Sequence, residues 1–169
     1  FLFNSRAPAP HAPAPVFVSG EGLDIDAVTL ELIADRAWPA ARRGRLGDWI
    51  VNSDAGYSGR LNACWPLGEP GLPLAAAVDV IEAGYGRAGL PPLFKPVDGL
   101  APALEAELVR RGYKARTETL MMTGPLLGEG GRADVTTDPD SRFETVFAGA
   151  QGNPADAAER MGAFRRIPA

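Results

Sequence analysis

The sequence predicts an α/β protein with a mixed central sheet and helices on both faces. Stretches with apolar residues at helical spacing alternate with short runs rich in β-branched and aromatic residues, and one region has the pattern of a hairpin. Strands joined through helices become parallel neighbours, whereas a hairpin adds an antiparallel portion. The chain has 169 residues, of which 46% are apolar and 22% charged, as is ordinary for one globular domain.

Residues 1–22 are predicted to form an extended tail rich in alanine and proline. Residues 7–15 read APAPHAPAP. Proline at this density removes backbone donors and fixes φ, which blocks helices and ladders and favours polyproline II. We therefore leave residues 1–22 out of the fold and assign residues 23–169 to one domain.

A first helix is predicted to run to about Ala37, with Asp24 at its N-cap. Glu31 and Asp35 fall on the side that we expect to face solvent. Trp38 precedes a proline and so ends the helix. Apolar residues at helical spacing form the stripe expected to face the core: Ile25, Val28, Leu32 and Ile33.

Residues 38–71 contain all three tryptophans and the only cysteine. Within them, residues 49–53 are predicted to form a strand and residues 57–65 a returning strand, with a turn between them. An arginine cluster precedes this hairpin, and we expect it either to be solvated or to contact an anion. Its members are Arg42, Arg43 and Arg45.

The remaining elements follow from glycine and proline punctuation. A helix from Leu74 to Ala88 ends at Gly89, and another begins at Pro102 and ends at Gly112. Asp138 or Asp140 is expected to cap a later helix. Further strands are predicted over residues 93–95, 117–122 and 133–137, and further helices over residues 140–149 and 154–164.

Composition excludes several classes of function. A net charge of −4 and a pI near 5.0 argue against nucleic-acid binding. One cysteine excludes an internal disulfide and a cysteine-based zinc site, and the one histidine, His11, lies in the tail, far from any nucleophile. We see no membrane span and no export signal, so we expect a cytoplasmic location.

Several short motifs lie between Arg36 and Tyr113. They are RAWPA at 36–40, LGDW at 46–49, GYSGRLN at 56–62, PLGEPGLP at 66–73, IEAGY at 81–85, GLPPLF at 89–94 and LEAELVRRGY at 104–113. Together they resemble the amino-terminal half of a group of two-part GNAT acetyltransferases. The resemblance predicts a GNAT-like central sheet over residues 23–169. Because the chain starts at Phe1 and stops after a helical pattern, we expect a fragment of a longer two-domain protein.

The resemblance implies N-acetyl transfer, with acetyl-CoA as the co-substrate. In this fold, a loop of pattern Gln/Arg-x-x-Gly-x-Gly/Ala precedes a helix whose N-terminus cradles the pyrophosphate. The corresponding residues 65–73 lack the leading glutamine or arginine, Glu69 has the wrong charge for phosphate, and three prolines lack donors. We therefore expect that this half does not hold acetyl-CoA in the usual way. The resemblance also leads us to expect an arginine where Asn52 stands.

Trp49, Arg60 and Asn62 are the candidate substrate-binding residues. Arg60 and Asn62 share one face of the predicted second strand, and Trp49 could lie near them. An arginine fork beside an amide and an indole suits a ligand with a carboxylate or an amide. The alternative is structural: Arg60 pairs with an aspartate of the hairpin, and Asn62 caps the neighbouring loop.

The sequence thus leaves two function hypotheses. The chain is the half of an N-acetyltransferase that lacks the usual acetyl-CoA loop and shapes the site of a small-molecule or peptide amine; alone, it is expected to be inactive. Alternatively, it is a non-catalytic binding or dimerisation module with a degenerate GNAT fold. The expected partner is a missing carboxy-terminal half or a second copy. No cofactor-binding or metal-binding residue is assigned.

Overall fold

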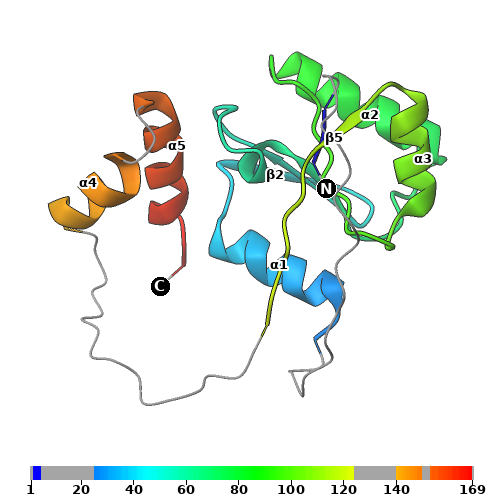
Figure 1. Cartoon of the computed structure of the whole chain (residues 1–169). Helices are drawn as coiled ribbons and strands as arrows, with labels where there is room; N and C mark the ends of the chain where they lie inside the picture. The colour runs from blue at the N-terminus through cyan, green and yellow to red at the C-terminus, as the bar shows by residue number, and fades with distance from the viewer. Residues whose placement is uncertain (1, 5–24, 124–139, 150–152, 169) are drawn as a thin grey trace.

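The computed structural model describes residues 2–4, 25–123, 140–149 and 153–168. These parts have a mixed α/β architecture with five α-helices and a small sheet (Figure 1). The elements in order are β1 (Leu2–Asn4), α1 (Ala27–Ala37), β2 (Arg42–Leu46), β3 (Trp49–Ser53), the 3-10 helix η1 (Arg60–Asn62), β4 (Cys64–Pro66), α2 (Leu74–Arg87), α3 (Pro102–Arg110), β5 (Lys114–Thr117), α4 (Ser141–Gly149) and α5 (Pro154–Arg165).

The central sheet has the order β2-β3-β4, and both pairs of strands are antiparallel. Gly47 and Asp48 join β2 to β3, and Gly47 has a φ of 56°, which suits the first position of a two-residue hairpin loop. Beyond β4, a single parallel bridge links Cys64 to Phe94. This bridge follows the crossover through α2, so the predicted parallel neighbour is present but is reduced to one residue.

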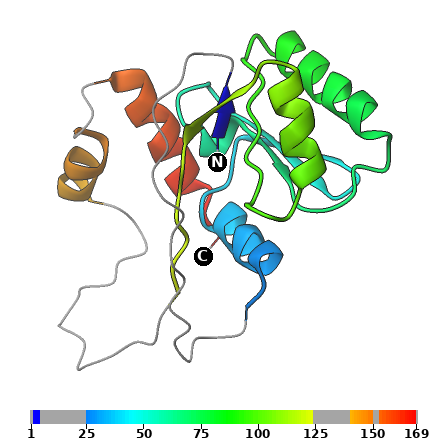
Figure 2. The same ribbon diagram turned by 45° about the vertical axis from the view of Figure 1, so that its right-hand side comes forward.

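Helices cover both faces of this sheet. Figures 1 and 2 show α1 on one side of the strands and α2 and α3 on the other. Alternation along β3 separates the two cores, because Trp49 packs with residues of α2 and α3 whereas Ile50 packs towards α1. The core under α2 and α3 contains Trp49, Cys64, Val78, Ile81, Tyr85, Phe94, Leu104, Leu108 and Tyr113; the core under α1 contains Ile50, Ala63, Trp65, Leu67 and Leu93.

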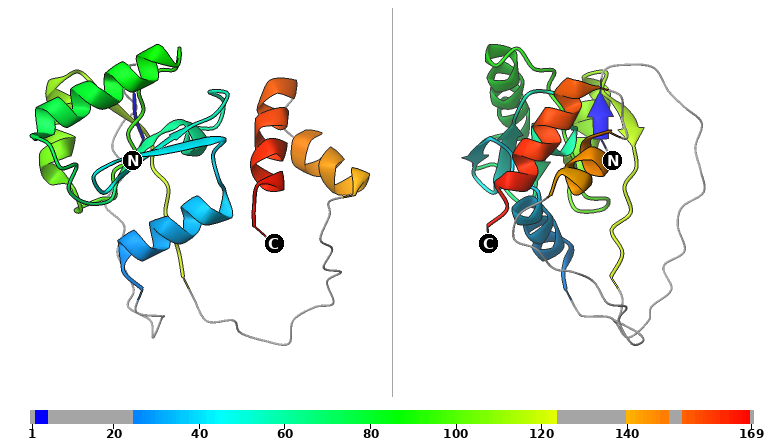
Figure 3. Two further views of the ribbon diagram at one scale, coloured as in Figure 1. Left: turned by 180° about the vertical axis from the view of Figure 1, so that it is seen from behind. Right: turned by 90° about the vertical axis from the view of Figure 1, so that its left-hand side faces the viewer.

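Helices α4 and α5 lie side by side, and α5 lies nearer to the sheet (Figure 3). Phe143 and Phe147 of α4 stack with a centroid separation of 5.4 Å, and Phe164 of α5 contacts both rings. Ala163 of α5 is buried in a small cluster with Leu61. The C-terminal helices are thereby connected to the segment that precedes β4.

The predicted return strand over residues 57–65 is present only at its end. Cys64 and Trp65 belong to β4, which pairs antiparallel with β3 as expected, whereas the residues before them form a loop and η1. The two-residue hairpin joins β3 to β2, the arginine-rich segment for which no strand was predicted. Asn62 explains the difference, because its side chain bonds to backbone groups of residues 54–58 and so competes with a ladder.

The predicted orientation of α1 was also wrong. Glu31 and Asp35, expected in solvent, are 8% and 4% exposed, whereas Leu32 and Ile33 are 37% and 52% exposed. The carboxylates are buried because they have partners. Asp35 accepts hydrogen bonds from Arg43 and Asn52, and Glu31 pairs with Lys95. The helix cap is Asp26, which accepts from the Thr29 N–H at 2.9 Å, and Asp24 lies outside the described residues.

Other predictions were met in part. Helices α2 and α3 begin and end close to their predicted bounds, and Gly89 and Gly112 have the expected positive φ. In α3, Leu104 and Leu108 are buried, whereas Val109 is 60% exposed. β5 ends at Thr117, where the strand was predicted to begin, and it pairs with β1, part of the segment assigned to the tail. The rest of that tail and the strand over residues 133–137 fall outside the described residues.

Asp35→Ala is predicted to destabilise the protein more than Leu32→Ala, although hydrophobicity alone suggests the reverse. Loss of Asp35 leaves the buried Asn52 amide without its acceptor and Arg43 without its counter-ion, at a cost of roughly 3 kcal/mol. Leu32→Ala should cost about 1 kcal/mol or less, because Leu32 is partly exposed. Urea denaturation of both variants measures the difference, and equal costs would contradict the burial of a paired carboxylate.

Candidate functional site

Trp49 lies in the core between the sheet and the helices α2 and α3. It is 2% exposed, and its ring packs edge-on against Phe94 with centroids 6.3 Å apart. The indole Nε1 donates to the carbonyl oxygen of Gly68 at 2.9 Å. This donor therefore joins β3 to the loop that precedes α2.

Arg60 lies at the start of η1 and is exposed. Within the described part of the chain, its guanidinium has no hydrogen-bond or ion-pair partner. Its charge is close enough to Lys95 to affect that group: burial lowers the pKa of the Lys95 ammonium, the bond to Glu31 opposes this, and Arg60 lowers it further. Of the three predicted site residues, Arg60 is the one with a free charged group.

Asn62 is 3% exposed and uses both ends of its amide. Its Oδ1 accepts from the N–H groups of Asp54 at 2.7 Å and Gly56 at 3.1 Å. Its Nδ2 donates to the carbonyl of Ser58 and to Glu159 Oε1, both at 2.8 Å. Asn62 thus caps the neighbouring loop, as the structural alternative predicted, and its amide also binds the Glu159 carboxylate of α5.

Glu159 completes this polar cluster from the far end of the chain. It is 4% exposed and accepts from the N–H groups of Tyr57 at 3.3 Å and Ser58 at 2.5 Å, besides the Asn62 amide. Arg166 adds an ion pair to Asp54 at 2.5 Å. Together these bonds attach α5 to residues 54–58. No sequence motif indicated the pairing, because the partners are about a hundred residues apart.

Residues 65–73, the position of the expected phosphate loop, join β4 to α2 and lie against the β2–β3 turn. The N–H of Asp48 donates to Glu69 O at 2.8 Å, and the Asp48 carboxylate accepts from the Glu69 N–H at 3.3 Å. A Cβ on Gly47 would collide with the carbonyl of Glu69, and one on Gly68 would lie 2.8 Å from the Asp48 side chain. The loop therefore offers fewer free donors than its length suggests.

The tyrosines of the core under α2 and α3 have hydrogen-bond partners. The Tyr85 hydroxyl donates to Asn52 O at 2.7 Å, and the Tyr113 hydroxyl donates to Glu82 Oε1 at 2.9 Å. Burial raises the pKa of both phenols, and for Tyr113 the bond to Glu82 raises it further. Burial likewise raises the pKa of the Cys64 thiol, so neither tyrosine nor this cysteine is activated for reaction at neutral pH.

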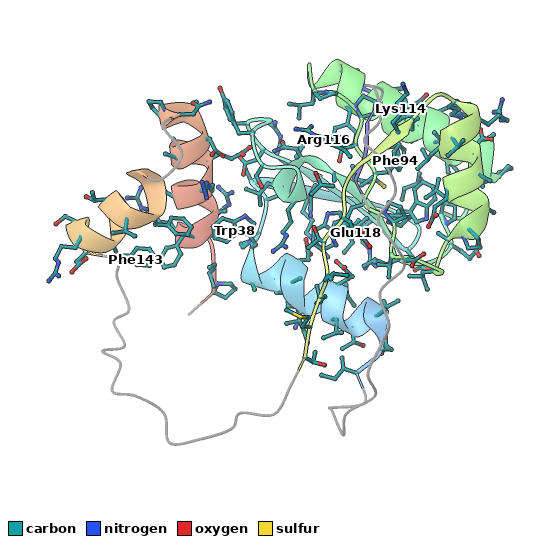
Figure 4. All side chains as sticks on the ribbon, viewed as in Figure 1. Trp38, Phe94, Lys114, Arg116, Glu118 and Phe143 are labelled. Carbon is teal, nitrogen blue, oxygen red and sulfur yellow. The ribbon has the colours of Figure 1, made fainter. Side chains whose placement is uncertain are left out.

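Two further polar side chains are buried between α1 and the sheet. Trp65 is 0% exposed, and the Lys95 ammonium lies 4.2 Å from its ring centroid. Within the described residues, neither Trp65 Nε1 nor Asn52 Oδ1 has a hydrogen-bond partner. Trp38 differs: it is half-buried at the end of α1 and meets Phe147 of α4 edge-on at 5.7 Å, in the region that Figure 4 labels with Trp38 and Phe143.

A shallow groove of about 350 Å³ lies on the face of the sheet that is opposite to α1, between β2, β3 and the C-terminal half of α2. Its apolar surface comes from Val51, Tyr85 and Ala88, and two glycines, Gly44 and Gly84, keep it open. Arg42 lies at its margin. The sequence indicated the arginines but not the groove, because the strand β2 was not predicted.

Comparisons with known proteins yielded no match among protein-family models, curated proteins or solved structures. Among the described residues, no cluster of three or more histidine, cysteine, aspartate or glutamate side chains could hold a metal ion. Asp140 accepts from the Phe143 N–H at 2.7 Å and so caps α4 as predicted. In the described helices, no segment is long and apolar enough to cross a membrane.

Glu159→Ala is predicted to release residues 54–58 and to lower the free energy of unfolding by roughly 3 kcal/mol, because the buried Asn62 amide and two part-buried backbone N–H groups lose a charged acceptor. Hydrogen exchange should accelerate at the Tyr57 and Ser58 amides. Glu144→Ala is the control, since its ion pair to Arg165 is partly exposed and should contribute little. Unchanged exchange at these amides in Glu159→Ala would show that α5 does not hold this loop.

Proposed function

We propose that this chain is the half of a two-part GNAT-like N-acetyltransferase that lacks the usual acetyl-CoA loop and contributes to the acceptor side. The supporting observation is that residues 65–73 have few free backbone donors. They join a strand to a helix, where the resemblance puts the acetyl-CoA loop. The Glu69 N–H, however, donates to the Asp48 carboxylate, and three of the positions are prolines, which have no N–H. The transferring chemistry then belongs to a partner half.

On this proposal, Arg60 is the acceptor-side contact. Trp49 and Asn62 hold the shape of the region through bonds to Gly68 and Glu159, whereas Arg60 is exposed and has no partner among the described residues. A guanidinium recognises a carboxylate or a peptide carbonyl on an amine substrate. The amine itself would be acetylated by the partner half, with acetyl-CoA as the donor.

Specific observations also favour a second function, a binding module without catalysis. The amide of Asn62 and the indole N–H of Trp49 are both engaged internally, and the phenols and the thiol are buried with raised pKa values. Such a module would use its surface and not a reaction site. The two functions differ in whether a small amine binds near Arg60.

Acetyl-CoA is predicted not to bind the 169-residue chain with submicromolar affinity, because residues 65–73 lack the free donors of a phosphate cradle. Isothermal titration calorimetry measures this directly. Asp48→Ala is a comparison variant. It frees the Glu69 N–H, so it should bind acetyl-CoA no more weakly than the unmodified chain does. Submicromolar binding to the unmodified chain would contradict the proposal that the loop is incompetent.

Arg60→Ala is predicted to weaken the binding of a carboxylate-bearing amine, such as a short peptide, by about tenfold, which corresponds to about 1.4 kcal/mol. Its melting temperature should barely change, because Arg60 is exposed and unpaired among the described residues. Arg87→Ala, at an exposed position at the end of α2, is the matched control and should leave binding unchanged. If the unmodified chain binds no such amine, or if Arg60→Ala lowers stability with binding intact, the module without catalysis becomes the better account.

A further inference from the structure

Strand β2 is an edge strand. It pairs with β3 on one side, and within the described residues no strand pairs with its other side. Residues 42–45 of β2 are all exposed. An exposed edge carries a row of backbone donors and acceptors that can pair with another extended chain. The edge therefore offers main-chain hydrogen bonds to a partner of any sequence.

The groove beside this edge can receive a side chain. It is lined by Gly44, Val51, Gly84, Tyr85 and Ala88, with a volume of about 350 Å³. A Cβ on Gly84 would meet no atom within 4 Å, so no packing contact requires a glycine there. Glycine inside a helix costs about 1 kcal/mol relative to alanine, so an open groove is kept at a cost in helix stability.

Arginines line both faces of the strand. Arg42 and Arg43 both border the groove. Alternation along the strand puts Arg42 on the face of Gly44 and puts Arg43 with Arg45 on the other face, where Arg43 bonds to Asp35 of α1. Arg43 is neutralised by Asp35 at 2.7 Å. Arg42 has only a 3.3 Å bond to the Ser53 hydroxyl, and Arg45 has no ion pair within the described residues. Two guanidinium charges therefore remain available, one on each face.

This charge pattern selects among occupants. A second copy that paired β2 with β2 would place arginines opposite arginines, and like charges in directly opposed positions are destabilising. A strand that carries carboxylates would meet the free guanidinium groups instead. An apolar residue between its acidic residues would point into the groove, because alternate side chains of a strand point to opposite faces.

We propose that β2 is a docking edge for an extended acidic segment of a partner protein. The segment adds to the sheet beside β2, inserts an apolar side chain between Gly44 and Gly84, and places carboxylates near Arg42 and Arg45. Main-chain bonds supply affinity, and the groove and the arginines supply specificity. This inference does not depend on the proposed acetyltransferase role, because it uses the edge of β2 and the groove beside it, and not Arg60.

The test uses the full 169-residue chain and a fluorescein-labelled peptide in which a single valine lies within a run of glutamates, so that carboxylates occur on both faces of the added strand. Fluorescence anisotropy should show saturable binding with a Kd on the order of 10 µM, weakening as salt rises. A lysine–valine peptide, and a glutamate–valine peptide with alternate N-methylated amides, should each bind at least about tenfold more weakly. No saturable binding, or equal binding of the lysine–valine peptide, overturns the proposal.

Two glycine variants of α2 test the groove itself. Gly84→Leu fills the groove and should weaken peptide binding at least about tenfold, whereas Gly86→Leu, on an exposed part of the same helix, should not. A Cβ added at either position would meet no atom within 4 Å, so both variants should fold, as circular dichroism can verify. The double change Arg42→Glu with Arg45→Glu should reverse the preference towards the lysine–valine peptide.

The remaining outcomes are also decisive. Unchanged affinity in Gly84→Leu would overturn the role of the groove. Concentration-dependent dimerisation in analytical ultracentrifugation that Gly84→Leu abolishes would assign this edge to a second copy and overturn the acidic partner.

Discussion

Two asparagine side chains of the sheet region each hold a buried carboxylate from a helix that is distant in the chain. Asn52 Nδ2 donates to Asp35 of α1, and Asn62 Nδ2 donates to Glu159 of α5, each at 2.8 Å. Hydrogen bonds to a charged group are stronger than neutral ones, and an unpaired buried carboxylate is costly. The positions of α1 and α5 therefore depend on these pairs. Asn52 also links the two layers, because its carbonyl accepts from the Tyr85 hydroxyl of α2.

The parts of the fold that the sequence predicted are those set by local signals. Helix α2 has an apolar face ending at a glycine of positive φ, and α3 begins at Pro102. Such features need only neighbouring residues. The strand Trp49–Ser53 was likewise predictable from its β-branched and aromatic content. These elements account for the core under α2 and α3.

The parts that could not be predicted depend on distant polar partners. Hydrophobic periodicity put Leu32 in the core and Asp35 in solvent, and only the partners Arg43 and Asn52 explain the reverse. The exposed, arginine-rich β2 lacks the alternation of a half-buried strand. Of the candidate site, the sequence offered a loop cap as the structural alternative for Asn62, but it did not indicate that Glu159 is the other partner of the amide.

The same bonds bear on function. Trp49 and Asn62 are engaged in holding the loop before α2 and the helix α5, so the polar groups that remain free lie elsewhere. Arg60 is one such group, beside Lys95, and Arg42 and Arg45 of β2, which have no ion pair within the described residues, are two more. The protein thus has a polar interior that fixes its helices and a basic surface in two places. We infer that the buried polar groups stabilise the fold and that the exposed arginines contact binding partners.

A double-mutant cycle between Asn52 and Asp35 tests most directly whether amide–carboxylate pairs position the helices. The free energy of unfolding is measured by urea denaturation for Asn52→Ala, Asp35→Ala and the combination. We predict a coupling energy of at least about 1.5 kcal/mol, since the two side chains bond directly in a buried site. A coupling energy near zero would contradict the account, because it would mean that the bond between Asn52 and Asp35 does not help to hold α1.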